Sequence, residues 1–367
     1  MDVARLTRRG VREITPYVPG QPIETVQRVR GLRRVLKLAS NENALGPSPR
    51  ALAAIRRELR AVHRYPDGSG FALKQRLAHH HGLDASAFVL GNGSDELVTL
   101  MLRAFLNEGD EVVLAKPTFL IYELAARLAH AEVITVPLTH ELRYDLPAMR
   151  RAISVHTKLV FIANPDNPTG SYITDGELAA FMLGLPPHVI VVFDEAYFEY
   201  REAPDYPDTT KYLHSHNVLI TRTFSKAYGL AGLRIGYGVA RPDLTTWVER
   251  VREPFNVNRL AQCAALAALD DVEHLRRTQT VTWEGKAYLA QQCERLGLRA
   301  VPSQANFLLI EVGPRAAIVA ERLVDRGILV RDLHPWGLDR YLRVTIGLPR
   351  ENRRVVKALR RVLRQVC

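Results

Sequence analysis

Residues 221–238 read TRTFSKAYGLAGLRIGYG and follow an apolar run at 218–220. This pattern predicts a buried strand that ends in a glycine-rich turn. Lys226 lies in that turn, and burial would lower the pKa of its amine and make it available as a nucleophile or base. A lysine of this kind forms a covalent imine with an aldehyde. Taken alone, the position favours a solvent-exposed loop, because most lysines are exposed.

The same stretch also supplies groups that bind phosphate. Thr223 and Ser225 contribute hydroxyls, and Arg234 contributes a fixed cation, all within one turn and its return. Hydroxyl and guanidinium groups are suitable donors to a phosphate dianion. A nucleophilic lysine beside a phosphate site indicates pyridoxal 5'-phosphate as the cofactor.

A second phosphate-binding element is predicted near residue 91. An apolar strand end at 88–90 runs into Gly-Asn-Gly at 91–93 and then into an amphipathic helix. Free backbone N–H groups and the helix dipole favour a phosphate at such a helix start. We expect Ser94 and Asp95 to supply these amides.

The string SKAYGLAGLRIGYG at 225–238 resembles the lysine region of the fold-type I, class I/II aminotransferases, which depend on pyridoxal phosphate. The similarity runs over nearly the whole chain, from Tyr17 to Arg343, with the motifs in the family's order. It implies an α/β fold with a large cofactor-binding domain, built on a mostly parallel central sheet, and a smaller α+β domain. We expect the large domain at 41–250, with 1–40 and 251–367 forming an N-terminal arm and the smaller domain.

The pattern of apolar segments supports this architecture independently. Alternating strands and helices predict a mostly parallel sheet covered on both faces, with ligands at the carboxyl ends of its strands. The strands are expected at 111–115, 132–137, 158–163, 189–194, 217–221 and 235–240, and the helices between them at 119–130, 145–153 and 175–183. Helices at 50–63, 243–253, 258–269, 271–295 and 351–365, and strands at 305–311, 328–330 and 341–345, complete the prediction.

Two of these strands end in polar residues. Asp194 ends the apolar strand at 189–194, and a buried carboxylate there needs a cationic or donor partner. The resemblance implies that Asp194 pairs with the protonated ring nitrogen of the cofactor. It also implies that Asn164, in ANPDNPTG, and Tyr197 donate to the phenolic oxygen. A structural salt bridge is the alternative for Asp194.

The segment KPTFLIY at 116–122 offers an aromatic side chain to the cofactor ring. Aromatic side chains stack on flat heteroaromatic rings, and the resemblance implies a stacking aromatic in this segment. We prefer Phe119 and leave Tyr122 open.

The resemblance also assigns residues to the substrate and to a second subunit. Arg343, in LRVTIG at 342–347, corresponds to the arginine that binds the substrate's anionic group, and Arg331 would add the second cation that a phosphate needs. Tyr17 and Asn43 are expected to line the substrate-binding region. Tyr65 is expected to reach the cofactor phosphate of the other subunit, which predicts a homodimer with shared active sites.

Composition adds limits on compartment and partners. Cys263, Cys293 and Cys367 have no metal-like spacing and favour a reducing compartment. Neither a signal core nor a run of about 18 apolar residues is present, so we expect a cytoplasmic protein that does not enter a membrane. The histidines at 79–81, 214 and 216 lack acidic or cysteine companions, and we predict no metal site. The formal charge of +11 is spread over the chain, which favours a solvated surface over nucleic-acid binding.

The activity implied by the resemblance is transamination between a small amino donor and a 2-oxo acid. The resemblance implies histidinol phosphate and 2-oxoglutarate as the pair, and arginines that can bind either a phosphate or a carboxylate agree with it. The open alternatives are an aromatic amino-acid donor and the decarboxylation of phosphothreonine on the same scaffold. A basic nucleic-acid-binding protein that merely keeps the fold is the alternative outside the enzymes.

Overall fold

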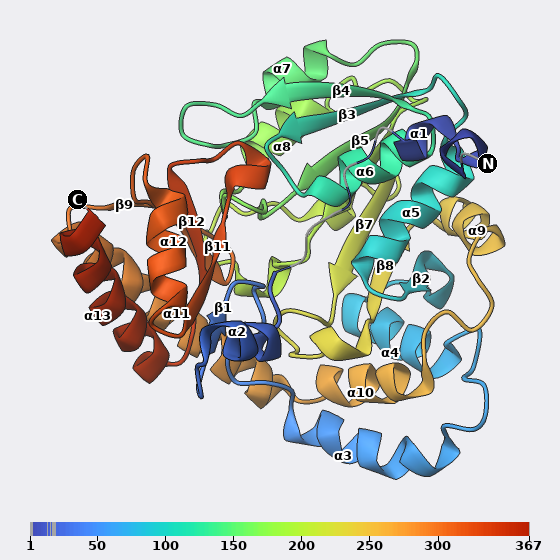
Figure 1. Ribbon diagram of the computed structural model, residues 1–367. Helices are drawn as coiled ribbons and strands as arrows, with labels where there is room; N and C mark the ends of the chain where they lie inside the picture. Colours follow the sequence, from blue (N-terminus) through green and yellow to red (C-terminus); the bar gives the residue numbers. More distant parts are fainter. Residues whose placement is uncertain (1–2, 13, 15, 17–19, 367) are drawn as a thin grey trace.

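The structure is a computed structural model that describes residues 3–12, 14, 16 and 20–366 (Figure 1). Within these residues the strands form two sheets, and the larger one has seven strands. In spatial order they are β2 (Phe88–Gly91), β8 (Gly236–Ala240), β7 (Asn217–Thr223), β6 (Ile190–Asp194), β5 (Thr157–Ala163), β3 (Glu111–Lys116) and β4 (Glu132–Pro137).

The larger sheet is parallel except at β8, which runs antiparallel to both β2 and β7. Strands β6 and β7, IVVFD and NVLITRT, are almost wholly buried, and the residues at their centres are apolar on both faces. The predicted alternation of strands and helices is confirmed. The carboxyl ends of β5, β6 and β7 therefore meet at one edge of the sheet, where ligands of such folds bind.

Helices surround this sheet, and their starts follow from local sequence. Ser48 accepts hydrogen bonds from the first backbone N–H groups of α3, with Pro49 as its first residue. Thr174 and Glu177 form a capping box at the start of α8. The helices are α3 (Pro49–Glu58), α4 (Phe71–His81), α5 (Ser94–Phe105), α6 (Leu120–Leu128), α7 (Leu146–Arg151), α8 (Asp175–Met182), α9 (Pro242–Arg250) and α10 (Arg259–Leu269).

The smaller sheet lies beside the larger one and joins the two ends of the chain (Figure 1). Its strands, in spatial order, are β1 (Leu36–Leu38), β11 (Ile328–Asp332), β12 (Tyr341–Thr345), β10 (Phe307–Glu311) and β9 (Arg299–Val301). β1 pairs in parallel with β11, while the other pairs are antiparallel. The remaining helices are α1 (Arg9–Arg12), α2 (Ile23–Arg30), α11 (Val272–Arg295), α12 (Ala316–Val324) and α13 (Pro349–Val366).

Helix α10 packs against α3, as Figure 1 shows at the bottom of the view. Its buried alanines belong to the same hydrophobic core as the larger sheet. This packing favours a domain boundary after Leu269, later than the division at residue 250 expected from the sequence. The parallel pairing of β1 with β11 agrees with placing 1–40 beside the C-terminal part. The division itself stays a prediction.

In the part of the chain that the structure describes, no helix combines the length and the apolar character needed to cross a bilayer.

Leu219, fully buried at the centre of β7, tests the core that carries the site. We expect Leu219→Ala to lower the free energy of unfolding by about 2–5 kcal/mol, because it removes buried methyl groups and leaves a cavity. Denaturant unfolding followed by tryptophan fluorescence measures the change. Leu183→Ala is the matched control, since Leu183 is 81% exposed and its loss should change stability by less than about 0.5 kcal/mol. Equal effects of the two substitutions would contradict the assigned core.

Candidate active site

One cavity lies between the carboxyl ends of β5, β6 and β7 and the strands β11 and β12 of the smaller sheet. It holds about 900 Å³ of space, part of it open to solvent. Most residues that the sequence analysis selected line this cavity together. They are Ser94, Asp95, Phe119, Tyr122, Asp194, Tyr197, Thr223, Ser225, Lys226, Arg234, Arg331 and Arg343.

Lys226 follows the end of β7, as predicted, and its amine faces the cavity. Nζ donates a hydrogen bond to the Ser40 carbonyl at 3.2 Å and lies 5.6 Å from the centre of the Tyr197 ring. Burial lowers the pKa of Lys226 to about 8, and the nearby Arg343 cation adds to the shift. The amine therefore loses its proton far more readily than a lysine in water, which is the property required of a nucleophile or base.

Asp194 is the last residue of β6, next to β7 in the sheet. The Tyr122 hydroxyl donates to Oδ2 at 2.6 Å, and the Ala196 backbone N–H donates to Oδ1 at 3.1 Å. Burial raises the pKa of Asp194 to about 6. A positive charge placed in the cavity beside this carboxylate would favour its ionised form.

A phosphate-binding set assembles at the start of α5. Gly93 has a φ of 83°, which favours glycine, and a Cβ at this position would push the Arg234 guanidinium group away from the turn. Arg234 donates to Ser225 Oγ at 3.4 Å and contacts Asp95 Oδ2 at 3.5 Å. The first backbone N–H groups of a helix have no partner within the helix. The helix start, the Ser225 hydroxyl and the guanidinium thus converge on one part of the cavity.

Tyr197 presents its hydroxyl near Lys226 and Arg343. The hydroxyl accepts a hydrogen bond from Asn41 Nδ2 at 2.9 Å, so its own hydrogen remains to be donated. Burial raises the pKa of Tyr197 to about 12, which keeps the hydroxyl protonated at neutral pH. Asn41 lines the cavity too, and the sequence analysis missed it.

Phe119 and Tyr122 both reach the cavity but in different settings. The Tyr122 ring stacks on Phe161, with centroids 4.8 Å apart and planes 11° apart, and its hydroxyl is bound to Asp194. Phe119 meets Tyr122 edge to face at 5.6 Å. Since Tyr122 already uses a ring face and its hydroxyl, this geometry favours Phe119 as the stacking aromatic.

Arg331 and Arg343 are register partners on β11 and β12, so their side chains enter the cavity side by side. Arg343 donates to the Asn167 side-chain oxygen and to the Ala39 carbonyl. Trp336 lies close to both cations, with its ring centre 5.1 Å from Arg331 Cζ and 6.0 Å from Arg343 Cζ. The two arginines form a strongly positive end of the cavity, able to bind an anion.

Asn164 does not line the cavity. Its side-chain oxygen accepts a hydrogen bond from the Ile173 N–H at 2.9 Å, and its amide faces the Ile173 carbonyl at 3.5 Å. Asn167, three residues later in the same ANPDNPTG motif, does line the cavity. The second Asn-Pro step was the signal that could have identified it.

Asn43 does not line this cavity but contacts the residue that follows Lys226. Its amide donates to the Ala227 carbonyl at 2.8 Å and to Thr278 Oγ1 at 3.2 Å, which holds the residue after Lys226 in place. Tyr65 is 78% exposed and stacks on Phe255 outside this cavity. Tyr17 lies outside the described residues. Trp336 is a further cavity residue that the sequence analysis missed.

Comparison with known proteins agrees with this geometry. Residues 33–359 match the family described as aminotransferase class I and II. This chain belongs to the class I and II aminotransferases. A histidinol-phosphate aminotransferase from Symbiobacterium thermophilum is 48% identical over 364 residues, which cover 97% of this chain and 98% of the relative. One from Moorella thermoacetica is 47% identical over 358 residues, covering 97% and 92%.

A solved structure of this aminotransferase family is similar throughout. The histidinol-phosphate aminotransferase of Sinorhizobium meliloti, in complex with pyridoxal-5'-phosphate, superposes with a TM-score of 0.91 at 30% identity, covering 98% of each chain. The predicted fold class and enzyme class are thereby confirmed. The alternative of a basic nucleic-acid-binding protein that only keeps the fold is not supported.

The pKa of Lys226 can be tested directly on the cofactor-free chain. We expect reductive methylation of Lys226 by formaldehyde to become half-maximal near pH 8, because the amine reacts only when unprotonated. A lysine in water, with a pKa of about 10.4, would require a much higher pH. Mass spectrometry of the peptide that contains Lys226 gives the profile, and Lys226→Ala confirms the assignment of the signal. A midpoint above pH 10 would contradict the burial argument.

Proposed function

We propose that this chain transfers the amino group of histidinol phosphate to 2-oxoglutarate, giving imidazole-acetol phosphate and glutamate in histidine biosynthesis. The observation that carries the proposal is the single cavity in which the Lys226 amine, the Asp194 carboxylate and the Arg331–Arg343 pair meet. Relatives named histidinol-phosphate aminotransferase match over nearly the whole length, which supports this donor.

The residues of the cavity fit pyridoxal 5'-phosphate. Ser94, Asp95, Ser225 and Arg234, with Thr223 behind Ser225, would hold the phosphate, because they combine helix N–H groups, hydroxyls and a cation. When bound, the cofactor supplies an electron sink for the substrate carbon that carries the amino group.

Asp194 and Tyr197 would orient the cofactor ring. Asp194 would pair with a protonated ring nitrogen, and this role is supported by the Tyr122 hydrogen bond, which fixes the direction of its carboxylate. Tyr197 would donate its hydroxyl hydrogen to the phenolic oxygen, since its hydroxyl oxygen already accepts a hydrogen bond from Asn41. Phe119 would cover one face of the ring.

Lys226 would act first as the covalent attachment point and then as the group that moves a proton. With a pKa of about 8, roughly a tenth of the amine is unprotonated at pH 7, far more than for a lysine in water. A base with a pKa near the working pH is well suited to take a proton from the substrate's amino-bearing carbon and return it.

The arginine pair would account for the binding of two different anions. Histidinol phosphate carries a phosphate ester and no carboxylate, whereas glutamate carries two carboxylates. Guanidinium groups bind either anion through paired N–H donors. Arg331 and Arg343 stand side by side where such a group would enter.

A panel of amino donors tests the proposal. We expect histidinol phosphate to give the highest kcat/KM, above histidinol, phenylalanine and phosphothreonine, and we expect no carbon dioxide from phosphothreonine. Arg331→Ala should lower kcat/KM for histidinol phosphate about 10- to 100-fold. The kcat/KM for histidinol should change by less than about threefold, because histidinol has no phosphate for Arg331 to bind.

The measurement is steady-state kinetics with 2-oxoglutarate as the amino acceptor. A wild-type preference for phenylalanine would indicate an aromatic amino-acid aminotransferase, and carbon dioxide release from phosphothreonine would indicate a decarboxylase. Either result would refute the proposed donor.

We also propose that the enzyme is a homodimer with shared active sites. The exposed apolar residues around α3 support an interface there, and they include Leu59, Val62, Tyr65, Phe71 and Phe255. Tyr65 projects from its own chain without reaching its own cavity, as a residue that serves a neighbouring site would.

Light scattering should give twice the chain mass of 41.3 kDa. The double substitution Tyr65→Asp and Phe255→Asp should reduce the mass to that of one chain, because it places charges in an apolar contact. Leu183→Asp, on another exposed apolar residue, is the control and should leave the mass unchanged. A single-chain mass for the unmodified protein would overturn the dimer.

We place the enzyme in the cytoplasm. Within the described chain, Cys263 and Cys293 are free thiols, which supports a reducing compartment.

A further inference from the structure

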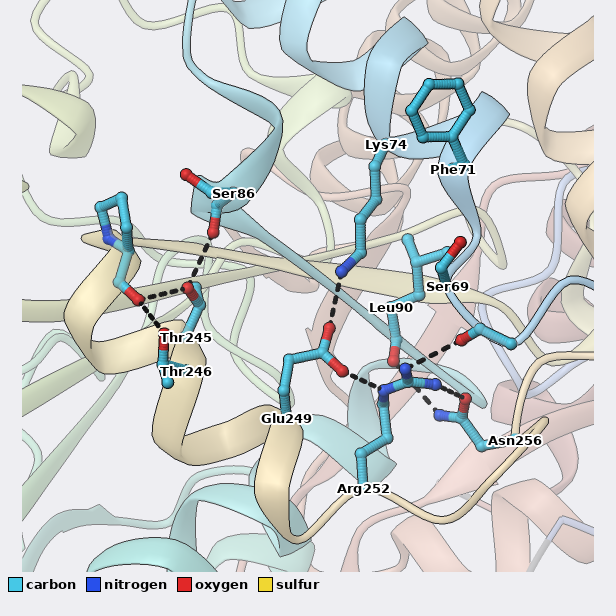
Figure 2. A network of polar contacts seen from close by, with 12 residues as sticks. Ser69, Phe71, Lys74, Ser86, Leu90, Thr245, Thr246, Glu249, Arg252 and Asn256 are labelled. Atoms are coloured by element: carbon cyan, nitrogen blue, oxygen red, sulfur yellow. Dashed lines mark hydrogen bonds and ion pairs between the residues drawn. The ribbon is translucent and has the colours of Figure 1, made fainter.

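A polar network joins the loop after α9 to the glycine turn that precedes α5. Figure 2 shows Lys74, Glu249, Arg252 and Asn256 linked in a row, and Asn256 also bonded to the Leu90 carbonyl. None of these side chains lines the cavity, yet the network ends one residue before the 91–93 turn. Its position suits a support for the phosphate-binding backbone.

Asn256 makes the contacts to the turn. Its Nδ2 donates to Glu96 Oε2 at 2.5 Å and to the Leu90 carbonyl at 3.2 Å. The same Glu96 oxygen accepts the backbone N–H of Asn92 at 2.6 Å. Glu96 therefore joins Asn92, in the middle of the turn, to Asn256. Ser94 lies in the sequence between Asn92 and Glu96, the two residues that are held.

Arg252 fixes the orientation of the Asn256 amide. Its Nη1 donates to Asn256 Oδ1 at 2.7 Å, which directs the amide nitrogen toward Glu96. Its other nitrogens donate to Glu249 at 2.6 Å and to the Gly68 carbonyl at 2.9 Å. Lys74 binds Glu249 at 2.6 Å and completes the row.

The same segment also holds the loop that carries Tyr65. Phe255 stacks on the Tyr65 ring with centroids 4.7 Å apart. Arg259 donates to the Tyr65 carbonyl at 3.0 Å, and Arg252 contacts Gly68 in the same loop. Residues 252–259 thus touch both segments that face a cofactor phosphate in the proposed dimer.

We propose that Asn256, oriented by Arg252, is a positioning residue for the cofactor phosphate: it fixes the backbone of the 91–93 turn so that the Ser94 and Asp95 amides point at the phosphate. The inference rests on the proposed function, since the phosphate belongs to pyridoxal 5'-phosphate. Amides held in advance bind an anion without the cost of ordering the loop. Asn256 acts on phosphate affinity and not on the chemistry at Lys226.

The test compares pyridoxal 5'-phosphate with pyridoxal, which has the same reactive aldehyde and no phosphate. Full-length protein freed of cofactor is titrated with each ligand. Absorbance at the violet end of the visible spectrum reports imine formation at Lys226. In Asn256→Ala we expect the Kd for pyridoxal 5'-phosphate to rise about tenfold and the Kd for pyridoxal to stay within about twofold.

Asn256→Asp guards against a failure to fold. It keeps the size of the side chain and the oxygen that Arg252 binds, but it loses the donor to Glu96, so it should show the same selective loss. Glu253→Gln is the matched control: its side chain is 66% exposed, pairs with Arg103 and lies in the same segment, and both Kd values should stay within about twofold of wild type.

The inference is overturned if both folded Asn256 variants bind pyridoxal 5'-phosphate as wild type does. It is equally overturned if they lose affinity for both ligands alike, since that pattern indicates a general structural role. If neither ligand changes the absorbance of the unmodified chain, the proposed function itself is refuted.

Discussion

The structure depends on holding one amine and one carboxylate in a largely enclosed cavity at the same edge of a sheet. Asp194 ends β6 and Lys226 follows the adjacent strand β7. Burial lowers the pKa of Lys226 and raises that of Asp194, so in both cases it favours the neutral form. A protein tolerates this only where a ligand or a hydrogen-bond partner compensates. Tyr122 does so for Asp194, and the apolar interiors of the two strands hold both groups in place.

Both sheets build the cavity around these two groups. The larger sheet supplies the amine, the carboxylate and the phosphate-binding turn, while the smaller one supplies the two arginines. Hydrogen bonds connect the part of the chain that carries the larger sheet to the part that carries the smaller one. Asn41 binds both Tyr197 and Thr345, and Trp336 donates to the Thr118 carbonyl. These hydrogen bonds join buried residues, and hydrogen bonds are stronger in such surroundings than in water.

Much of this was readable from the sequence, because long apolar strands with polar ends carry a strong signal. Asp194 was predicted from a strand end and Lys226 from a strand end with phosphate-binding neighbours, both with the help of the family resemblance, and the structure brings both to the cavity. Asn167 was missed in favour of Asn164 because two Asn-Pro steps share one loop and only the folded backbone shows which amide turns inward. Strand β9, with three residues, is too short for alternation to show, and the role of Trp336 depends on contacts distant in sequence.

Strand β1 pairs in parallel with β11, and Leu36 lies opposite Ile328. The smaller sheet can therefore form only after the C-terminal part of the chain has been synthesised. Chains leave the ribosome from the N-terminus, and domains fold as they emerge. The strands of the larger sheet have all been synthesised once residue 240 is reached, so they can associate before β11, the partner of β1, exists. A nascent chain at that point already carries Lys226 but neither Arg331 nor Arg343, and its cavity is complete only after β11 and β12 have been released.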